Sequence, residues 1–441
     1  MIVPPLEIIC FYIFALLVSY SVAQDTKFDT SVDRFETHVE LDGDLDRLFT
    51  VEYRNWYKVV TNHAVNQKYA LVCCGQRPTG KAADLEHYDA VVDIPVKTVG
   101  VDGAFNVLPF IDLLHLQDTV DFINGFENVT SPCYANVTKQ EGAADIVFVE
   151  TDGINARKNS IVFSANDNQM TPLAKADWLL YLSLFFNKEK EAISILDTIK
   201  RQYNCHASNL ATTSKRPTIA WTSYQQGEWY MYREPYFQQL LKDAGSKLAI
   251  PSVPLQFHHD IHNADMVIDQ TDLAKDLSDA DATYNDWLSA GNFEPGTVSF
   301  DQPFIHHNAL YRVDGLTDEK GFLDWTQRAA ARPDLALTDM IHYSYPLYDR
   351  SYQYVWLRNF AKMDHVRTLS LASYSCANPL DSIKPCSLQK DLFEDPSSPR
   401  HPGNVGLILG ILIAAGLVIG GVLFYKSRRQ VKPEYFPLSN F

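Results

Sequence analysis

From residue 48 onward, short apolar runs alternate with amphipathic segments. Residues 48–74, LFTVEYRNWYKVVTNHAVNQKYALVCC, place two β-rich runs around the polar stretch NHAVNQ and predict a hairpin. AVVDIPVKTVGV predicts a strand, LPFIDLLHL a short helix, and ADIVFVET and NSIVFSAND two buried strands. Strands that alternate with helices are typical of an α/β lobe with a largely parallel sheet.

The stretch that follows, residues 172–206, predicts a long helix. Thr171 is a good N-cap and Pro172 suits the first helical position. Apolar residues then recur at helical spacing, and no Gly or Pro interrupts residues 173–206. We expect one helix, or two nearly collinear helices that meet at Asn187, with the charged stretch NKEKE as a solvated joint.

The α/β pattern begins again after this helix. TIAWTSY, ADMVIDQ and GTVSFDQ predict strands, EPYFQQLLKDAG predicts a helix, and ARPDLALTDMIHYSYP predicts a helix that starts near Pro333. These segments indicate a second α/β lobe. From residue 375 to 404, prolines recur among acidic residues and serines, which is typical of an extended stalk.

Both ends of the chain carry membrane signals. Residues 1–23 combine an apolar run with small residues before Ala23 and predict a cleaved signal peptide; an uncleaved anchor is the alternative. Residues 405–425 contain no charge and are long enough to span a bilayer, and four Lys or Arg follow within residues 426–432. We therefore expect a single-pass type I protein of the cell membrane, with its first part extracellular and residues 426–441 in the cytosol.

Charge and cysteine content agree with an extracellular protein. The net charge of −16 repels phosphate backbones, so nucleic acid is not an expected partner. Six cysteines follow the signal peptide, an even number that predicts disulfides. Cys376 and Cys386 form the easiest local bridge, and Cys73 and Cys74 are expected to reach two different partners. Two sequons predict glycosylation, and the tail carries a Tyr-x-x-Leu pattern of endocytic sorting signals; these positions are Asn128, Asn136, Tyr435 and Leu438.

Six segments resemble, in the same order, blocks of the class III bacterial substrate-binding proteins that serve iron-siderophore and vitamin B12 importers. They are FTVEYRNWYKVVTN, VDIPVKTVGV, TPLAKADWLLYLSLFFNKEKEAISILDTIKRQYN, YFQQLLKDAG, PGTV and RPDLALTDMI. The resemblance implies an N-terminal lobe at 24–171, a linking helix at 172–206, a C-terminal lobe at 207–374 and a stalk at 375–404. In that family the ligand lies in the cleft between the lobes.

The resemblance also implies a function. Together with the predicted C-terminal membrane span, the chain looks like a eukaryotic, for example algal, surface protein that captures a ferric siderophore such as ferrichrome for iron uptake. No intrinsic cofactor is expected. The captured complex would be passed to partners, such as a ferric reductase or, after endocytosis, an adaptor. The sequence has no G-x-S-x-G, H-E-x-x-H, P-loop or G-x-G-x-x-G motif, so no enzymatic activity is predicted.

Candidate ligand-binding residues follow predicted strands or belong to aromatic-rich loops. Aromatic walls suit a bulky, largely apolar ferric hydroxamate, and amide and guanidinium groups can donate to hydroxamate oxygens. The candidates are Phe105, Asn106, Asn166, Tyr224, Gln225, Trp229, Tyr230, Arg233, His306, His307, Trp325 and Arg328. Tyr236 and Phe237 are interpreted as helix core. The family's hydroxamate-binding Arg has no clear counterpart here, and Arg157 is the nearest substitute.

Two alternatives remain open. HHDIH at residues 258–262 and the pair His306 and His307 could bind Fe, Zn or Mn directly, although neither has a recognised ligand spacing. Such a protein would be a metal-ion receptor. A surface adhesion or signalling receptor that has kept the fold without a ligand would, in contrast, have no use for an aromatic cleft.

Overall fold

The computed structural model describes residues 28–41, 48–75, 85–138, 142–150, 157–277, 279, 281–380 and 385–389. The first sheet along the chain has four strands, in the order β1 (Phe49–Arg54), β2 (Tyr57–Asn62), β3 (Gln67–Cys73) and β4 (Ala90–Ile94). The β2–β3 pair is antiparallel and joined at NHAVNQ, so the predicted hairpin is confirmed.

A second sheet of the first lobe is entirely parallel. Its order is β6 (Val120–Asn124), β5 (Val99–Asp102), β7 (Ile146–Val149) and β8 (Ser160–Val162). AVVDIPVKTVGV therefore forms two strands, β4 and β5, in two different sheets, and not one. The 3-10 helix η3 (Phe105–Val107) and α2 (Leu108–Leu113) follow β5, while η4 (Gln117–Thr119), η5 (Phe126–Asn128) and η6 (Pro132–Tyr134) flank β6.

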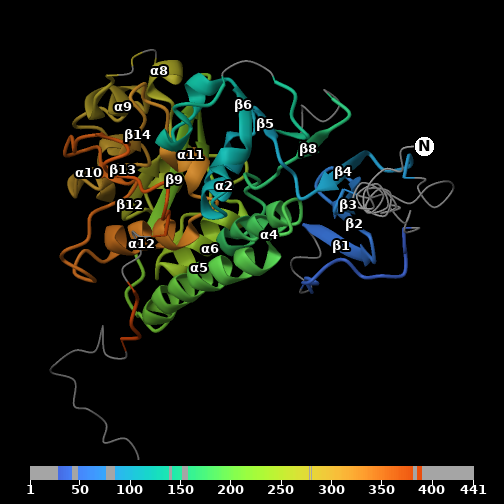
Figure 1. The fold of residues 1–441 in the computed structure, drawn as a ribbon. Coiled ribbons are helices and arrows are strands. Elements are labelled where there is room, and N and C mark those ends of the chain that lie inside the picture. The colour runs from blue at the N-terminus through green and yellow to red at the C-terminus, as the bar shows by residue number, and fades with distance from the viewer. Residues whose placement is uncertain are drawn as a thin grey trace, which may run out of the picture. The chain divides into compact units, whose positions relative to one another are not determined.

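The linking segment consists of α3 (Pro172–Ala176), α4 (Trp178–Ser183) and α5 (Glu189–Leu210), which run along the lower part of Figure 1. The Thr171 hydroxyl accepts the Ala174 N–H at 3.4 Å, as expected of an N-cap. Asn187 has a φ of 53°, in the left-handed region, and this residue separates α4 from α5. The expected joint lies at Asn187, but Glu189 is only 4% exposed, so a fully solvated joint is wrong.

The second lobe is built on a sheet in the order β10 (Glu228–Met231), β9 (Thr218–Gln225), β12 (Met266–Asp269), β13 (Leu310–Arg312) and β15 (Arg358–Asn359). The strands β9, β12 and β13 are parallel, β11 (Lys247–Leu248) pairs with β9, and β14 (Leu316–Thr317) pairs with β16 (Arg367–Thr368). GTVSFDQ is not a strand: it contains the 3-10 helix η8 (Val298–Phe300), and Val298 is 89% exposed.

Helices cover both faces of this sheet. One buried cluster joins β9 to α6 (Pro235–Asp243), α11 (Asp324–Arg328) and α12 (Pro333–Ser344), and the orange α12 lies along the green α5 in Figure 1. A second cluster on the opposite face contains α7 (Phe257–Ile261), α9 (Tyr284–Ala290) and α10 (Pro303–His306), and the short α8 (Leu273–Asp276) follows β12. The predicted mixed α/β fold is thus confirmed, while the single long linking helix is wrong, because three helices, α3, α4 and α5, lie between the sheets of the two lobes.

Part of the expected stalk is attached to the lobes. Residues 375–380 and 385–389 carry Cys376 and Cys386, which are bonded to Cys133 and Cys205. An extended stalk therefore cannot begin at residue 375. Within the described residues, none of the helices combines the length and the apolar character of a membrane span. The predicted signal peptide, the span at 405–425 and the sorting residues Tyr435 and Leu438 lie outside the described residues.

Candidate functional site between the lobes

The carboxyl ends of β8, β12 and β13 meet the linking segment at a cavity of about 290 Å³ between the lobes. Loops that follow parallel strands gather at one edge of a sheet, which is where α/β proteins commonly bind ligands. The cavity is lined by Asn166, Asn168, Lys175, Tyr236, Phe237, Gln270, Val313, Leu323, Trp325, Thr326, Ala329 and Ala330. It thus takes side chains from both lobes and from α3.

Lys175 is the one charged residue of this lining. The side chain projects from α3, is 5% exposed, and donates to the Asn166 carbonyl oxygen at 3.1 Å and to Asn168 Oδ1 at 2.9 Å. Its Nζ lies 4.2 Å from the centroid of the Tyr236 ring. Burial lowers the pKa of Lys175 to about 8, against a smaller opposing effect of Asp167. The ammonium group is therefore protonated near neutral pH and held in place.

Three aromatic residues also line the cavity. Tyr236 and Phe237 come from the first turn of α6, where Pro235 suits the first helical position. Trp325 is 7% exposed, and its ring lies 5.9 Å from that of Trp221, whose Nε1–H donates to Gln270 at 3.2 Å. The cavity thus combines one cation with aromatic rings and several uncharged polar side chains.

The helix α11 closes the neighbouring part of the cleft by packing against η3 and α2 of the first lobe. Gln327 accepts the Thr130 N–H at 3.1 Å, and Thr130 Oγ1 also donates to Asp324 at 3.3 Å. Arg328 donates through Nε to Asp324 at 2.7 Å and lies 5.2 Å from the Trp356 ring. Arg328 thus pairs with Asp324 beside the contact between the lobes and is not among the residues that line the cavity.

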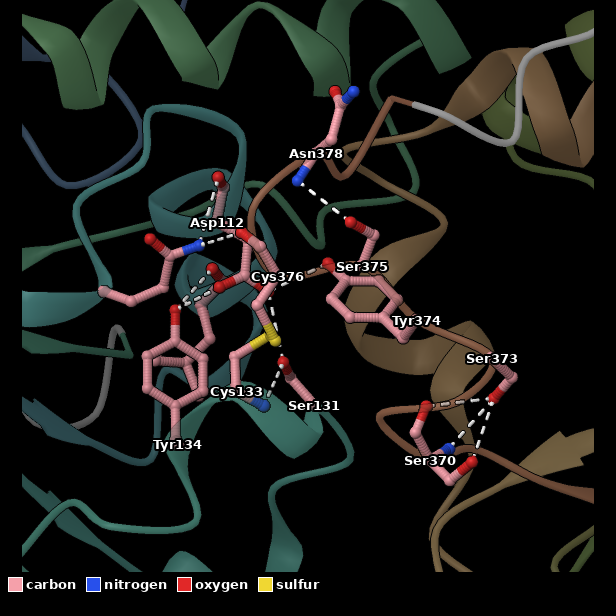
Figure 2. The surroundings of a disulfide bond; sticks show 12 residues. Asp112, Ser131, Cys133, Tyr134, Ser370, Ser373, Tyr374, Ser375, Cys376 and Asn378 are labelled. Carbon is pink, nitrogen blue, oxygen red and sulfur yellow. Dashed lines mark hydrogen bonds between the residues drawn. A yellow bond between two sulfur atoms is a disulfide. The ribbon is translucent and has the colours of Figure 1, made fainter.

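A disulfide strengthens this contact (Figure 2). Cys133 of the first lobe is bonded to Cys376, across 243 residues of sequence. Beside it, buried Asp112 accepts hydrogen bonds from Tyr134 at 2.6 Å and from Tyr374 at 2.9 Å. Burial raises the pKa of Asp112, against the opposing effect of these hydrogen bonds. Because Tyr374 belongs to the core of the second lobe, this cluster joins the two lobes.

The cysteine pairing differs from both expectations. Cys376 is not bonded to Cys386; Cys386 pairs with Cys205 of α5 instead. Cys73 and Cys74 pair with each other and not with two separate partners. The fold brings the C-terminal segment against α5 and against η6, and neither proximity is visible in the spacing of the cysteines.

The aromatic hairpin of β9 and β10 has its rings on two faces. Successive strand residues point to opposite sides, so Tyr224 lies on the face away from Trp221. Trp229 packs there, with its ring stacked 4.4 Å from Phe257. Tyr230 is 46% exposed. Gln225 donates to Ser223 at 3.0 Å, and Arg233 is exposed. The predicted residues Tyr224, Gln225, Trp229, Tyr230 and Arg233 are therefore not among those that line the cavity.

The remaining candidates lie in three places. Asn166 and Trp325 are among the residues that line the cavity, and their role in ligand binding stays a prediction. Phe105 and Asn106 belong to η3, against α11; Asn106 is 3% exposed, and its Oδ1 has no hydrogen-bond partner among the described residues. His306 and His307 precede β13 and so lie at the sheet edge opposite the cavity, with His306 2.8 Å from Asp301.

Lys175, Tyr236 and Phe237 are cavity residues that the sequence did not identify. For Lys175 the sequence does hold a signal, since a lysine within the apolar stretch that follows Thr171 is unusual. Arg157, the substitute considered for a ligand-binding arginine, pairs with Asp102 at 3.0 Å. No lining residue of the cavity is an arginine.

The histidine-rich segment forms α7. His258 Nε2 lies 2.6 Å from the Gly291 carbonyl oxygen, and His259 lies 3.2 Å from Asp260. Within the part of the chain that the structure describes, no three His, Cys, Asp or Glu side chains are grouped as a metal site would need.

Comparison with known proteins gives structural likeness only. No protein-family model and no curated protein matches the sequence. Among solved structures, an ABC transporter substrate-binding protein from Listeria monocytogenes is 15% identical, with a TM-score of 0.42 over 57% of this chain and 99% of its own. A triscatecholate siderophore binding protein from Bacillus subtilis is 14% identical, with a TM-score of 0.39 over 57% and 94%. A vitamin B12 binding protein from Vibrio cholerae is 8% identical, with a TM-score of 0.40 over 58% and 99%. TM-scores below 0.5 assign no ligand to this chain.

Proposed function

We propose that this chain is a cell-surface solute-binding protein that captures a ferric siderophore, of the hydroxamate type, in the cavity between its lobes. The observation that carries the proposal is Lys175, a buried ammonium group that faces an aromatic cavity. Burying a charge is costly unless it has partners, and two oxygen acceptors hold this one at the cavity wall. Such a group can donate to the oxygen atoms of a ligand.

The charge of the lining favours a ferric hydroxamate over a catecholate complex. One ammonium group and no carboxylate line the cavity, so a ligand with little net charge is matched better than a complex with three negative charges. Tyr236, Phe237 and Trp325 provide flat apolar area at low entropic cost. The volume of about 290 Å³ is at the lower end for ligand pockets, so a bulky complex would insert one part and leave the rest at the rim.

The remaining elements of the proposal come from the sequence. A signal peptide at 1–23 and a membrane span at 405–425 would display the lobes at the cell surface. Tyr435 and Leu438 would allow internalisation, and a ferric reductase or an endocytic adaptor would act on the captured iron. These partners are proposed because the chain contains no energy-coupling motif of its own.

A fluorescence titration tests the proposal. The purified chain is titrated with a ferric hydroxamate, a ferric catecholate and free Fe(III) or Zn(II), and tryptophan emission is followed because Trp325 lies in the cavity. We expect quenching by the hydroxamate complex. Quenching by free metal alone would favour a metal-ion receptor, and no response to any ligand would refute capture and favour a ligand-free adhesion or signalling receptor.

Lys175→Met is the decisive variant, since it keeps most of the side-chain length and removes the charge. A hydrogen bond from a charged group contributes about 1.5–3 kcal/mol, so affinity should fall by at least about tenfold. Lys190→Met, at an exposed position of α5, is the matched control and should leave affinity unchanged. Equal affinity of the two variants would remove Lys175 from the binding site.

A further inference from the structure

A further cavity, of about 370 Å³, lies in the second lobe next to α11 and the small sheet of β14 and β16. Its volume falls within the range of small-molecule sites. Arg328 and Arg367 line it, whereas no Asp or Glu is among its lining residues. We call it the arginine cavity. It shares no lining residue with the cavity between the lobes.

Arg367 on β16 is held in place by neutral acceptors. Its backbone N–H donates to the Gly315 carbonyl oxygen at 3.1 Å. Its Nη2 donates to the carbonyl oxygens of Tyr354 and Val355, each at 2.6 Å. Among the described residues, no carboxylate forms an ion pair with this guanidinium group, and Nε and Nη1 make no hydrogen bond. Arg367 therefore gives the arginine cavity a net positive charge.

Arg328 contributes a hydrogen-bond donor more than a charge. Asp324 accepts from its Nε at 2.7 Å and lies 2.5 Å from its Nη2, so the charge of Arg328 is balanced. The guanidinium carbon lies 5.2 Å from the centroids of the Trp356 and Tyr374 rings, and the residue is 8% exposed. Its Nη1 has no hydrogen-bond partner within the part of the chain that the structure describes.

Apolar side chains lie beside Arg367. Leu316 of β14 is its partner in the parallel pairing of β14 with β16, so the two side chains share one face of this small sheet. Leu369 follows two residues later, and its N–H donates to the Thr317 carbonyl oxygen at 2.8 Å, which continues the pairing. Leu316 and Leu369 both line the cavity, and further apolar surface comes from Leu335, Val355 and Pro379.

The segment that carries Tyr374 forms another side of the arginine cavity (Figure 2). Ser373, Tyr374, Ser375 and Asn378 are lining residues of this segment. The Ser373 hydroxyl donates to the Ser370 carbonyl oxygen at 3.1 Å, and the Ser375 hydroxyl accepts the Asn378 N–H at 3.1 Å. These two hydroxyl groups thus stabilise local turns, and the arginines remain the stronger donors for a ligand.

We propose that the arginine cavity is a second ligand site, separate from the siderophore site, that binds a small organic carboxylate with an apolar body. Arg367 pairs with the carboxylate, and Leu316, Leu369 and the Tyr374 ring contact the apolar part. Guanidinium groups match the planar geometry of a carboxylate. Inorganic phosphate is a poorer match, because it carries polar oxygens on every side and would place some of them against leucine side chains.

The test is isothermal titration calorimetry on the full-length chain in a non-ionic detergent. The probes are phenylacetate, its uncharged analogue phenylacetamide, and inorganic phosphate. We expect saturable binding of phenylacetate, with about fivefold weaker binding of phenylacetamide, the equivalent of roughly 1 kcal/mol for a partly screened ion pair. Phosphate should also bind more weakly than phenylacetate. Absence of phenylacetate binding, or binding of either other probe with equal affinity, overturns the proposal.

Three variants locate the binding in the arginine cavity. Arg367→Gln should weaken phenylacetate binding by about fivefold. Arg350→Gln, the same substitution at an exposed position outside both cavities, should leave it unchanged. Arg367→Lys keeps the charge and should bind more tightly than Arg367→Gln. An equal loss in both variants of Arg367 would mean that a structural change, and not the charge, is responsible, and would overturn the proposal. Phenylacetate binding that Arg367→Gln does not weaken refutes the assignment, whatever the siderophore titration shows.

Discussion

The buried pair Lys58 and Glu189 provides the sharpest test of how the linking segment is held. Lys58 lies on β2 with a side chain that is 0% exposed, and Glu189 is the first residue of α5 with a side chain that is 6% exposed. Lys58 Nζ donates to both Glu189 Oε1 and Asn187 Oδ1. The pair therefore connects the first sheet to the joint of the linking segment.

Lys58→Met removes the cation and leaves a buried carboxylate without its partner. Breaking a buried ion pair from one side costs about 3–5 kcal/mol, because the remaining charge stays desolvated. The double variant Lys58→Met with Glu189→Leu removes both charges, and replacement of both partners by apolar side chains is often neutral. We therefore expect the double variant to recover most of the free energy of unfolding that the single variant loses.

The assay is urea unfolding of a chain that ends at Lys390, the end of the compact unit, followed by tryptophan fluorescence and circular dichroism. Lys190→Met, on the exposed side of α5, should stay within about 0.5 kcal/mol of the unmodified chain. A loss below about 1 kcal/mol for Lys58→Met would mean that the carboxylate regains water. A double variant no more stable than the single one would show that packing of the lysine, and not charge pairing, is what matters.

Three further predictions follow from the structure. With Cys205–Cys386 intact, the Cys133–Cys376 disulfide closes a loop of about 80 residues, so replacing both of its cysteines by Ser should lower the free energy of unfolding in urea by about 4.5 kcal/mol. The Cys73–Cys74 disulfide joins neighbouring residues and closes no comparable loop, so its removal should cost little. Gly315→Ala should lower the thermal midpoint, because the new Cβ would lie 2.6 Å from the Trp356 carbonyl oxygen; an unchanged midpoint would contradict this close approach. Because the pKa of Lys175 is lowered to about 8, siderophore affinity should fall as the pH rises from 7 to 9. The free energy of unfolding should change in the opposite direction, since the cost of burying the ammonium group is fully present below pH 8 and is relieved as the pH approaches 10.5. The Lys175→Met variant should show neither change.

The order of strands and helices was predictable because it depends on local patterns. The N-cap at Thr171, the hairpin at NHAVNQ and the helix that starts at Pro333 use turn and capping chemistry that is visible in a few residues. The prediction of a strand at GTVSFDQ is wrong because its alternating apolar residues have no neighbouring strand to pair with, and Val298 remains exposed. A periodic pattern predicts a strand only where a sheet edge is available to pair with it.

The lining of the cavity between the lobes was less predictable, because it depends on which face each residue presents. The hairpin around Trp229 has the aromatic composition of a ligand site, but the strand register turns Trp229 toward the core of the second lobe. Tyr236 was interpreted as helix core and is indeed 4% exposed, yet it also forms a wall of the cavity. Lys175 could not be distinguished from a surface lysine until the neighbouring Asn166 and Asn168 were placed around it.

Under the proposed function, the contacts between the lobes bear on how the cavity would select a ligand. The linking segment joins the lobes along α5, and on another side Cys133–Cys376 and the hydrogen bonds of Asp112 join them again. Moving the lobes apart at α11 would also expose Asp324 and Gln327, which are 2% and 7% exposed. A cavity held from several sides loses little conformational entropy when a ligand binds. Discrimination would then depend on whether one part of the ligand fits the existing volume and reaches Lys175. A ligand whose inserted part is too large or too highly charged would not be bound better by a movement of the lobes.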